Sequence, residues 1–327
     1  MSLVLKQKIS TAGAWRGSEL SHDESWIHYW SESACNALDD ALRHVRKQGR
    51  ELTHLRKADF PLDTLAPEMA RLTEELETGR GFVLLRGLPV ERYSEDDLRL
   101  IYYGIGMNLG QPVRQNPKGD LLGLVMNVGD LNDKHTRVYE TNAHLPYHTD
   151  PSDVFGLLCV RRAKSGGLSS LVSAAAIYNE LLEHHAEYLG LFYRTFYYAH
   201  MGEDMPSLTP LFSFHDGKLS CRYLRQYIEL GHEIWGSPLS RVEVAALDRF
   251  DAIAQDPGIR LDMMLEPGDM QFANNYAVLH SRTRFEDFDE PARRRKLLRL
   301  WLKMPNARTL APDFPGRNGF GMPNSEP

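Results

Sequence analysis

The sequence of 327 residues has few cysteines, no long apolar run and no excess of positive charge. Cys35, Cys159 and Cys221 are odd in number and far apart, which argues against a disulfide framework and favours a reducing, cytoplasmic location. No stretch approaches the roughly 18 apolar residues of a membrane-spanning helix, and the first residues lack the apolar run of a signal peptide. The net charge of −6 disfavours binding to nucleic acid or anionic membranes. We therefore expect a small-molecule substrate as the partner.

The composition is that of a globular enzyme. Hydrophobic residues make up 42% and charged residues 25% of the chain, which is enough apolar material for a core and excludes disordered and collagen-like proteins. At roughly 100–200 residues per domain, the length allows two domains or one large β-domain. The sequence leaves the oligomeric state open and is compatible with a homo-oligomer.

The first third of the chain is expected to be mainly helical. Apolar residues recur at helical spacing over 33–47 and over 65–76. The run 81–87 is apolar and ends in glycine, which predicts a buried strand, and Ser94 followed by three acidic residues predicts the start of a helix. We predict that residues 1–80 form a helical region packed on the core, as a lid or an interface.

Beyond residue 120 the pattern changes to short apolar segments separated by turn signals. Asp216-Gly217 between two such segments is a strong hairpin signal. Many short strands with frequent turns indicate a sandwich or barrel, and we predict a mainly β fold of the α+β class, with a jelly-roll (double-stranded β-helix) core flanked by helices. This core is expected to span 81–303, and a Pro/Gly-rich tail to span 304–327. The expected strands are 121–128, 154–160, 168–173, 195–199, 211–215, 218–224, 261–265, 270–272 and 296–303, and the expected helices are 175–186 and 239–254.

The segment around His148 has the residue types of a metal site. On an extended chain, residues i and i+2 point to the same side, so His148 and Asp150 direct an imidazole and a carboxylate to one point. His280 lies at the end of another short extended run, 130 residues after Asp150. Two histidines and one carboxylate are the facial triad that holds non-haem Fe(II) and leaves coordination positions open. The absence of clustered cysteines argues against a structural zinc ion.

The residues that follow His280 strengthen this interpretation. A His-x-Asp pair alone is weak evidence in a chain with 13 histidines, most of which are expected on the surface or in the core. The strand predicted over 296–303, together with the residue before it, carries Arg295 and Arg299 on one face. A buried arginine is costly unless it binds an anion, and its guanidinium can bind a carboxylate through two hydrogen bonds. A solvated edge strand would explain Arg294 but would not explain Arg299.

In their order and spacing these motifs resemble the taurine dioxygenase-like (TauD/TfdA) family of Fe(II)/2-oxoglutarate-dependent oxygenases, which is related to clavaminate synthase. The resemblance covers about residues 80–303. It rests on Gly81-Phe82, Arg86-Gly87, His148-Thr149-Asp150, Ser165-Gly166-Gly167-Leu168-Ser169, Pro267-Gly268-Asp269, Asn275 to His280, and Arg295 to Arg299.

The resemblance implies a role for each residue that matches a family position. His148, Asp150 and His280 would be the ligands of Fe(II) and the catalytic centre. Arg295 would bind the distal carboxylate of the cosubstrate 2-oxoglutarate. The loop after His280 is longer than in the shortest members, so Arg294 is an alternative, but strand alternation favours Arg295.

The resemblance also implies contacts to the cosubstrate and to the prime substrate. Ser169 stands where the family usually has a threonine that hydrogen-bonds the distal carboxylate of 2-oxoglutarate, and it keeps the hydroxyl. Arg299 matches the arginine that binds the anionic group of the prime substrate. Asn142 matches a position that often touches substrate, although a neighbouring asparagine or threonine could serve equally.

The implied activity is that of a dioxygenase that uses Fe(II), 2-oxoglutarate and O2, and that releases succinate and CO2. Halogenating relatives lack the carboxylate, so Asp150 implies hydroxylation, or desaturation through the same hydrogen abstraction. The substrate is expected to be a small carboxylate or amino-acid-like compound, or less so a sulfonate or phosphonate. If Arg299 instead pairs with an internal acidic residue, the substrate would be neutral.

Two other classes of protein could use the same three residues. A zinc-dependent hydrolase would need a general base beside the metal-bound water, and it gives no role to Arg295 or Ser169. A catalytically silent jelly-roll binding protein would need neither the triad nor a cosubstrate site. The dioxygenase hypothesis uses all of these residues.

Overall fold

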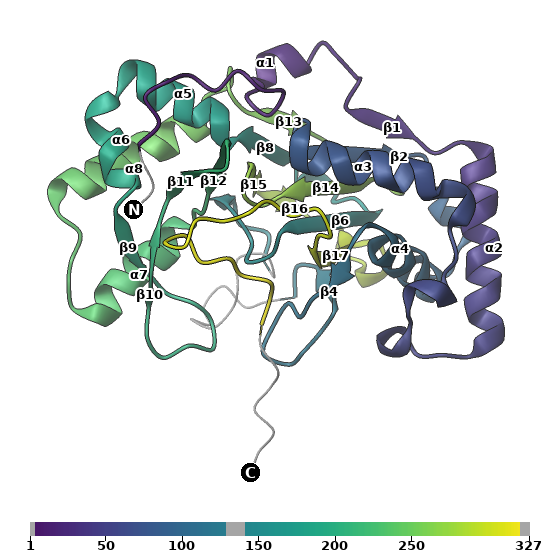
Figure 1. Cartoon of the computed structure of the whole chain (residues 1–327). Helices are drawn as coiled ribbons and strands as arrows, with labels where there is room; N and C mark the ends of the chain where they lie inside the picture. The colour runs from purple at the N-terminus through teal and green to yellow at the C-terminus, as the bar shows by residue number, and fades with distance from the viewer. Residues whose placement is uncertain (1–3, 129–140, 321–327) are drawn as a thin grey trace.

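Two β-sheets that pack face to face form the centre of the protein (Figure 1). The computed structural model describes residues 4–128 and 141–320, so the start of the expected N-terminal region and the end of the expected tail lie outside the described residues. The larger sheet consists of β1 (Ile27–Tyr29), β2 (Phe82–Arg86), β14 (Met270–Asn274), β6 (Val154–Arg161), β17 (Lys296–Lys303) and β3 (Gln111–Pro112) in that order, with β4 (Leu122–Val125) also paired to β17. The smaller sheet has the order β13 (Leu261–Met263), β8 (Ser169–Ser173), β15 (Val278–Arg282) and β5 (Leu145–His148).

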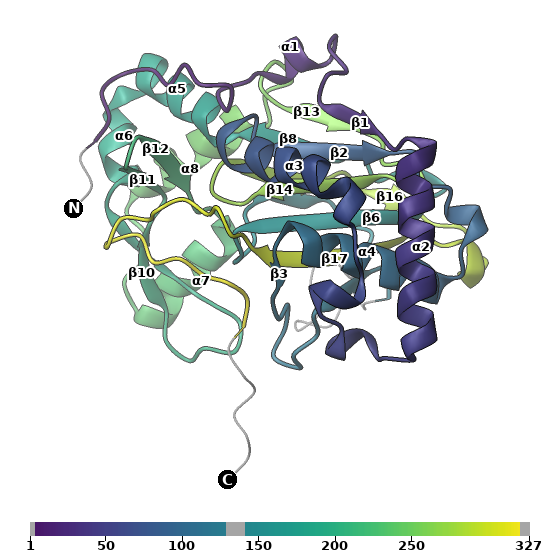
Figure 2. The ribbon, with the colours of Figure 1, turned by 45° about the vertical axis from the view of Figure 1, so that its right-hand side comes forward.

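The larger sheet is buried on both faces. In β2, Phe82 and Leu84 pack between the two sheets, whereas Val83 and Leu85 pack against helices on the outer face. Because both faces are covered by protein, the strand is apolar from Phe82 to Leu85 and shows no polar alternation there. The helices on this outer face are α2 (Glu32–Gln48), α3 (Ala66–Thr78) and α4 (Glu95–Leu109), as Figure 2 shows.

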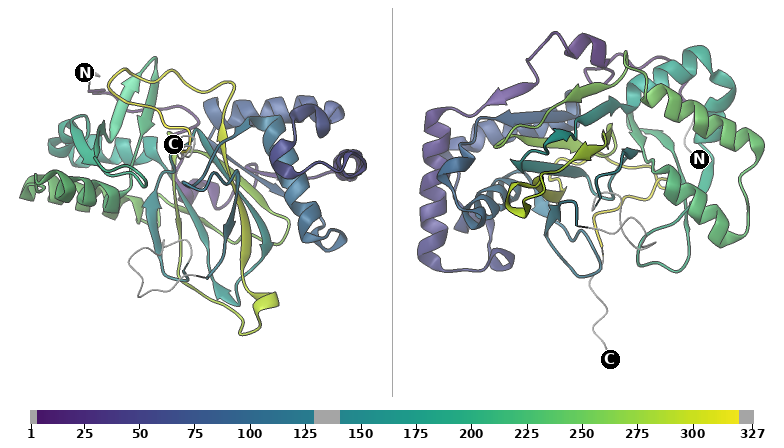
Figure 3. Two further views of the ribbon diagram at one scale, coloured as in Figure 1. Left: turned by 90° about the horizontal axis from the view of Figure 1, so that it is seen from below. Right: turned by 180° about the vertical axis from the view of Figure 1, so that it is seen from behind.

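A second group of helices lies on the opposite side of the β-core (Figure 3). It surrounds two short hairpins, and Asp216-Gly217 forms the turn of one of them with φ of 49° and 73°, as predicted. The helices are α5 (Ala174–His184), α6 (Ala186–Phe192), α7 (Arg225–Trp235) and α8 (Arg241–Ala254), and the hairpins are β9 (Thr195–Tyr198) with β10 (Ser207–Pro210) and β11 (Phe212–His215) with β12 (Lys218–Cys221). None of the described helices is both long enough and apolar enough to cross a membrane.

The predicted fold class is confirmed, and most predicted elements lie within a few residues of the observed ones. The strand predicted over 296–303 coincides with β17, and Ser94 caps α4 through hydrogen bonds with the Asp97 backbone and side chain. The prediction of only two helices after residue 120 was wrong, because α6 and α7 are also present. Only one side of α7 is buried, at Ile228, Gly231 and His232, and this helical spacing was the missed signal. The division into the regions 1–80, 81–303 and 304–327 stays a prediction.

An ion pair between Arg86 and Asp269 ties the end of β2 to the turn before β14. Arg86 Nη2 lies 2.7 Å from Asp269 Oδ2, and Arg86 Nε lies 3.0 Å from Asp269 Oδ1. Asp269 is 1% exposed, and its Oδ2 also accepts a hydrogen bond from the Glu266 backbone. Gly268 has φ of +93°, and a side chain there would collide with the carbonyl of Leu88. These contacts give Arg86, Gly268 and Asp269, which belong to the Arg-Gly and Pro-Gly-Asp motifs, a structural role.

We expect Arg86→Leu to lower the free energy of unfolding by about 2–3 kcal/mol, because it leaves the buried Asp269 carboxylate without its counter-charge. Arg162→Leu is the matched control, because Arg162 pairs with Glu266 of the same turn while both side chains are about half exposed. That surface pair should contribute less than about 1 kcal/mol. Urea unfolding at neutral pH measures the free energy of unfolding of both variants. Equal losses would show that the buried ion pair of Asp269 stabilises the protein no more than the surface pair.

Candidate active site

Three side chains with metal-binding atoms meet between the two sheets. His148 ends β5, Asp150 follows it after one residue, and His280 lies in β15. The two strands are antiparallel neighbours, and His148 and His280 are direct cross-strand partners. Residues that oppose each other across two strands project to the same face of the sheet, so both imidazoles point to one place.

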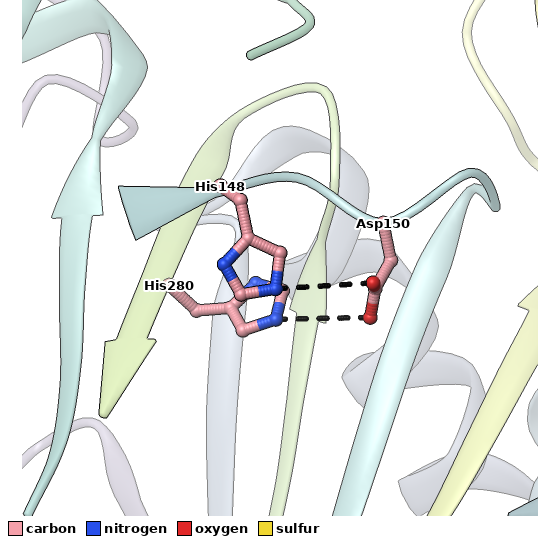
Figure 4. Close-up of side chains that lie close together, drawn as sticks. All are labelled: His148, Asp150 and His280. Atoms are coloured by element: carbon pink, nitrogen blue, oxygen red, sulfur yellow. Dashed lines mark ion pairs between the residues drawn. The ribbon is translucent and has the colours of Figure 1, made fainter. Parts of the chain in front are cut away.

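The geometry of the three residues suits one metal ion (Figure 4). Their ligand atoms all lie within 4.8 Å of one another. His148 Nε2 is 3.9 Å from Asp150 Oδ1, and His280 Nε2 is 3.7 Å from Asp150 Oδ2. Both rings turn their Nε2 atoms towards the carboxylate, and this leaves a common point between the three groups. The structure therefore brings together the triad that the sequence predicts.

Neighbouring groups hold these side chains in place. The carbonyl of Pro146 is 2.8 Å from His148 Nδ1, so Nδ1 carries the proton and Nε2 keeps its lone pair. Trp301 Nε1 donates to Asp150 Oδ2 at 2.9 Å, and the Asp150 backbone N–H donates to the side chain of Asn275. The ring of Phe155 stacks on His280 at 3.8 Å between ring centroids. These contacts restrict the rotamers of the three residues before any ligand arrives.

The charge states also suit a metal ion. Burial lowers the pKa of His148 and, to a greater extent, of His280, and the charge of Arg299 acts in the same direction. Burial by itself raises the pKa of Asp150, but attraction to His280 and Arg299 outweighs it, and the pKa lies below its usual value. Two neutral imidazoles and one carboxylate result, which is a donor set that fits Fe(II).

A cavity of about 1020 Å³ opens in front of the triad. Apolar side chains such as Phe155 and Leu297 line the part beside the histidines. The polar part includes five arginines from different segments, and their number is unexpected in a chain of net charge −6. These arginines are Arg222, Arg282, Arg295, Arg299 and Arg317.

Arg295 lines this cavity, whereas Arg294 does not. Arg295 is 6% exposed, its guanidinium lies over the ring of Phe285, and its Nη1 atom is buried with no hydrogen-bond partner. Burial lowers the pKa of Arg295 to about 10. Arg294 is half-buried and donates to the carbonyl of Asp289. The preference for Arg295 that strand alternation suggested therefore agrees with the arrangement of the side chains.

The Gly166-Gly167 pair allows the close approach of the segment around Phe285. Both glycines have positive φ, and a side chain on Gly166 would collide with the carbonyl oxygen of Arg284. Ser169, two residues after Gly167, lines the cavity, and its hydroxyl donates to Gln271 Oε1 at 2.9 Å. The glycine-rich motif thus serves the packing of two backbone segments beside the cavity.

The sequence analysis missed Arg282, which lies opposite Ser169 on the neighbouring strand. Arg282 is 5% exposed, donates to the carbonyl of Ala143, and has a buried Nε atom with no partner. Burial and the charge of Arg295 lower its pKa to about 9. Arg282 follows His280 by two residues, so strand alternation places it on the same face, and this was the available signal.

Arg299 lies in β17 and nearer to the triad than Arg295, which directly precedes this strand. It is 8% exposed, donates from Nε to Gln115 Oε1 at 2.7 Å, and lies over the ring of Trp301. Gln115 is almost fully buried and also donates to the carbonyl of Arg299. The neutral side chain of Gln115 therefore holds Arg299 at two points, the guanidinium and the backbone carbonyl.

Asn142 is the one predicted site residue that the structure does not bring to the cavity. It is half-buried, and its carbonyl accepts a hydrogen bond from the Phe285 backbone. His144, which the sequence analysis did not count as a ligand, is exposed. A contact of Asn142 with substrate stays a prediction.

Comparison with known proteins identifies what the chain is similar to. The model of the family described as "Taurine catabolism dioxygenase TauD, TfdA family" matches residues 48–301. FR-33289 synthase from Streptomyces rubellomurinus is 34% identical over 315 residues, which cover 93% of each chain. The taurine hydroxylase-like protein SAT17 from Stachybotrys chartarum is 28% identical over 312 residues, which cover 91% of this chain and 80% of the relative.

Solved structures support the fold. Asparagine oxygenase in complex with Fe(II), 2S,3S-3-hydroxyasparagine and succinate superposes with a TM-score of 0.69 at 16% identity, over 85% of this chain and 93% of that chain. The non-haem iron oxygenase OrfP in complex with Fe has a TM-score of 0.64 at 15% identity, over 90% of this chain and 99% of that chain.

We expect His148→Ala, Asp150→Ala and His280→Ala each to weaken binding of a divalent metal, because each removes one of three ligands. Metal content after anaerobic dialysis against Fe(II) measures this effect, and the thermal midpoint of the metal-free protein checks the fold. His144→Ala is the control and should retain the metal. A His280→Ala variant with a full metal complement would refute the assignment.

Proposed function

The chain belongs to the TauD, TfdA family of dioxygenases, and on this premise we propose that it hydroxylates or desaturates a small anionic substrate held by Arg299 beside the His148–Asp150–His280 triad. The enzyme uses Fe(II), 2-oxoglutarate and O2. The observation that carries the proposal is a buried guanidinium on the wall of the same cavity as the triad. Such a cation is suited to bind an anionic group of the substrate.

The role of the protein is to hold the reactants and to keep water out. His148, Asp150 and His280 would hold the iron, which when bound with its cosubstrate supplies the oxidation of an unactivated C–H bond. Trp301 donates to the Asp150 carboxylate and Asn275 accepts from the Asp150 backbone N–H, so the orientation of this ligand is set by the protein. The apolar wall around Phe155 and Leu297 excludes water from the reacting carbon.

We assign the distal carboxylate of 2-oxoglutarate to the end of the cavity formed by Arg295, Ser169 and Arg282. Two buried guanidiniums with unpaired nitrogen atoms, Arg295 Nη1 and Arg282 Nε, support this assignment. The guanidinium carbons of Arg295 and Arg282 lie over the ring of Phe285, at 5.1 and 4.7 Å from its centroid. A carboxylate placed between them would satisfy these donors and would separate their like charges.

Arg299 would hold the anionic group of the prime substrate, preferably a carboxylate. The anchored end decides which carbon lies in front of the metal, so oxidation should fall a few bonds from the anion. A neutral analogue of the substrate should be turned over less efficiently, because it would lose the charged hydrogen bond with Arg299. The substrate of FR-33289 synthase, the 34% identical relative, is a suitable first compound to test.

The other two classes of function receive less support. A zinc-dependent hydrolase gives no role to the unpaired nitrogen atoms of Arg295 and Arg282. A silent binding protein gives no reason for the tautomer-fixing contact of His148 or for the Trp301 contact of Asp150. Release of CO2 from 2-oxoglutarate that requires Fe(II) distinguishes the dioxygenase from both.

Arg295→Ala should raise the KM for 2-oxoglutarate by about 30- to 150-fold, because it removes charged hydrogen bonds worth about 2–3 kcal/mol. Its effect on the KM for the prime substrate should be much smaller. Arg294→Ala is the matched control and should change neither value by more than about threefold. Steady-state succinate formation measures all of these values, and a reversed order would mean that Arg294 binds the cosubstrate.

Arg299→Leu should abolish the preference for an acid over its methyl ester or amide, once a substrate has been found. The wild-type enzyme should turn over the acid at least about tenfold more efficiently, since one lost charged hydrogen bond costs about 1.5–3 kcal/mol. The dependence on 2-oxoglutarate should change little. Equal turnover of the acid and its neutral analogue by the wild-type enzyme would end the assignment of Arg299.

A further inference from the structure

Arg222 is a further buried cation on the wall of the same cavity. It directly follows β12 and is 6% exposed. The carbonyl of its neighbour Tyr223 accepts a hydrogen bond of 2.8 Å from the backbone N–H of Thr149, which lies between the two ligands His148 and Asp150. Arg222 is therefore tied to the metal-binding segment from a different element than β17, which carries Arg299.

Most of the hydrogen-bonding capacity of Arg222 is unused. Its Nη1 atom donates to the carbonyl of Pro315 at 2.7 Å, and its guanidinium lies over the ring of Phe314. Within residues 4–128 and 141–320, no carboxylate forms an ion pair with Arg222, and its Nε and Nη2 atoms have no hydrogen-bond partner. Burial is the main cause that lowers its pKa, and an anion would offset this cost.

Apart from Arg299, the other basic side chains of the cavity wall are paired, uncharged or assigned to the cosubstrate or the metal. Arg317 lies at 2.5 and 3.2 Å from the two carboxylate oxygens of Glu203. Burial is the main cause that lowers the pKa of His200 to about 3, so this imidazole is uncharged. Arg295 and Arg282 lie at the end of the cavity assigned to the cosubstrate. Arg222 and Arg299 therefore provide the positive charge of the part of the cavity that is left for the substrate.

We propose that the prime substrate carries two anionic groups, one bound by Arg299 and one by Arg222, with the oxidised carbon between them. The proposal rests on the proposed function, since it names the class of substrate for that site: a small dianion such as an α,ω-dicarboxylate. A single anion at Arg299 would leave the charge of Arg222 buried in the complex. An anion at each end fixes the molecule at two points and thereby selects one carbon for oxidation.

The experiment compares each diacid with its monoamide, which has nearly the same shape but one charge less. Glutarate, adipate and pimelate and their monoamides are titrated into enzyme loaded with Mn(II) and saturated with N-oxalylglycine, so that the cosubstrate site is filled. Isothermal titration calorimetry measures the dissociation constants without turnover. At least one diacid should bind about tenfold more tightly than its monoamide.

Arg222→Gln should reduce this preference to less than about threefold. Glutamine removes the charge and keeps an uncharged side chain that can form hydrogen bonds at this position. Arg225→Gln is the matched control, because Arg225 lies three residues further along, outside the cavity lining, in ion pairs with Glu229, Asp248 and Asp251. The control should keep the preference. If Arg222→Gln does not fold, Arg222→Lys keeps the charge and should keep the preference for the diacid.

Equal binding of diacid and monoamide by the wild-type enzyme, or no binding of any diacid, would overturn the proposal. A loss of affinity for both compounds in Arg222→Gln would also overturn it, because it would show that Arg222 only holds the C-terminal segment. Formation of succinate from 2-oxoglutarate by the Fe(II) enzyme without added substrate distinguishes a failure of the proposed function from a failure of the dianion proposal. If that reaction is absent in the wild type, the proposed function fails; if it is present without a diacid preference, only this inference fails.

Discussion

The antiparallel pairing of β5 with β15 is the constraint on which the rest of the site depends, because it sets His148 directly opposite His280. A slip of one residue in this register would turn one imidazole to the other face of the sheet and remove it from the site. Asp150 is then held at two points, because Trp301 donates to its carboxylate and Asn275 accepts from its backbone N–H. The register shifts after His280, yet Arg282 still lies opposite Ser169 on the other neighbouring strand. One strand thus carries His280 of the triad and Arg282 of the cavity wall.

The burial of the larger sheet on both faces gives this site its rigid support. In β17, Leu298, Leu300 and Leu302 face helix α4 and belong to the core on that side of the sheet, while Arg299 and Trp301 line the cavity. The leucines bury apolar area on one side of the strand and so stabilise the strand that holds charged groups on the other. An arginine on a solvated strand would have many rotamers, whereas Arg299 is held by Gln115 and by the ring of Trp301.

The cavity concentrates positive charge in a protein whose net charge is −6. Buried guanidiniums such as Arg222 and Arg295 lose hydration, and an anion beside them would offset this cost. Part of the cost of placing charged groups in a binding site is met when the protein folds, before a ligand enters. The proposed preference for anionic over neutral ligands follows from this, because a neutral ligand of the same shape would form weaker hydrogen bonds with these guanidiniums.

The sequence by itself determined the local features of this protein. Apolar periodicity and turn residues are local signals, so they predicted the jelly-roll class, the Asp216-Gly217 hairpin and the bounds of β17. The spacing of His148, Asp150 and His280 predicted the triad, because residue type and strand alternation limit what such residues can do together. Strand alternation favoured Arg295 and Arg299, but only the tertiary structure decided that Arg222 lines the cavity and that Asn142 does not. The packing of distant strands and of the C-terminal segment sets the burial of Arg222 and Arg282, and no local pattern encodes the contact between segments that far apart in the chain.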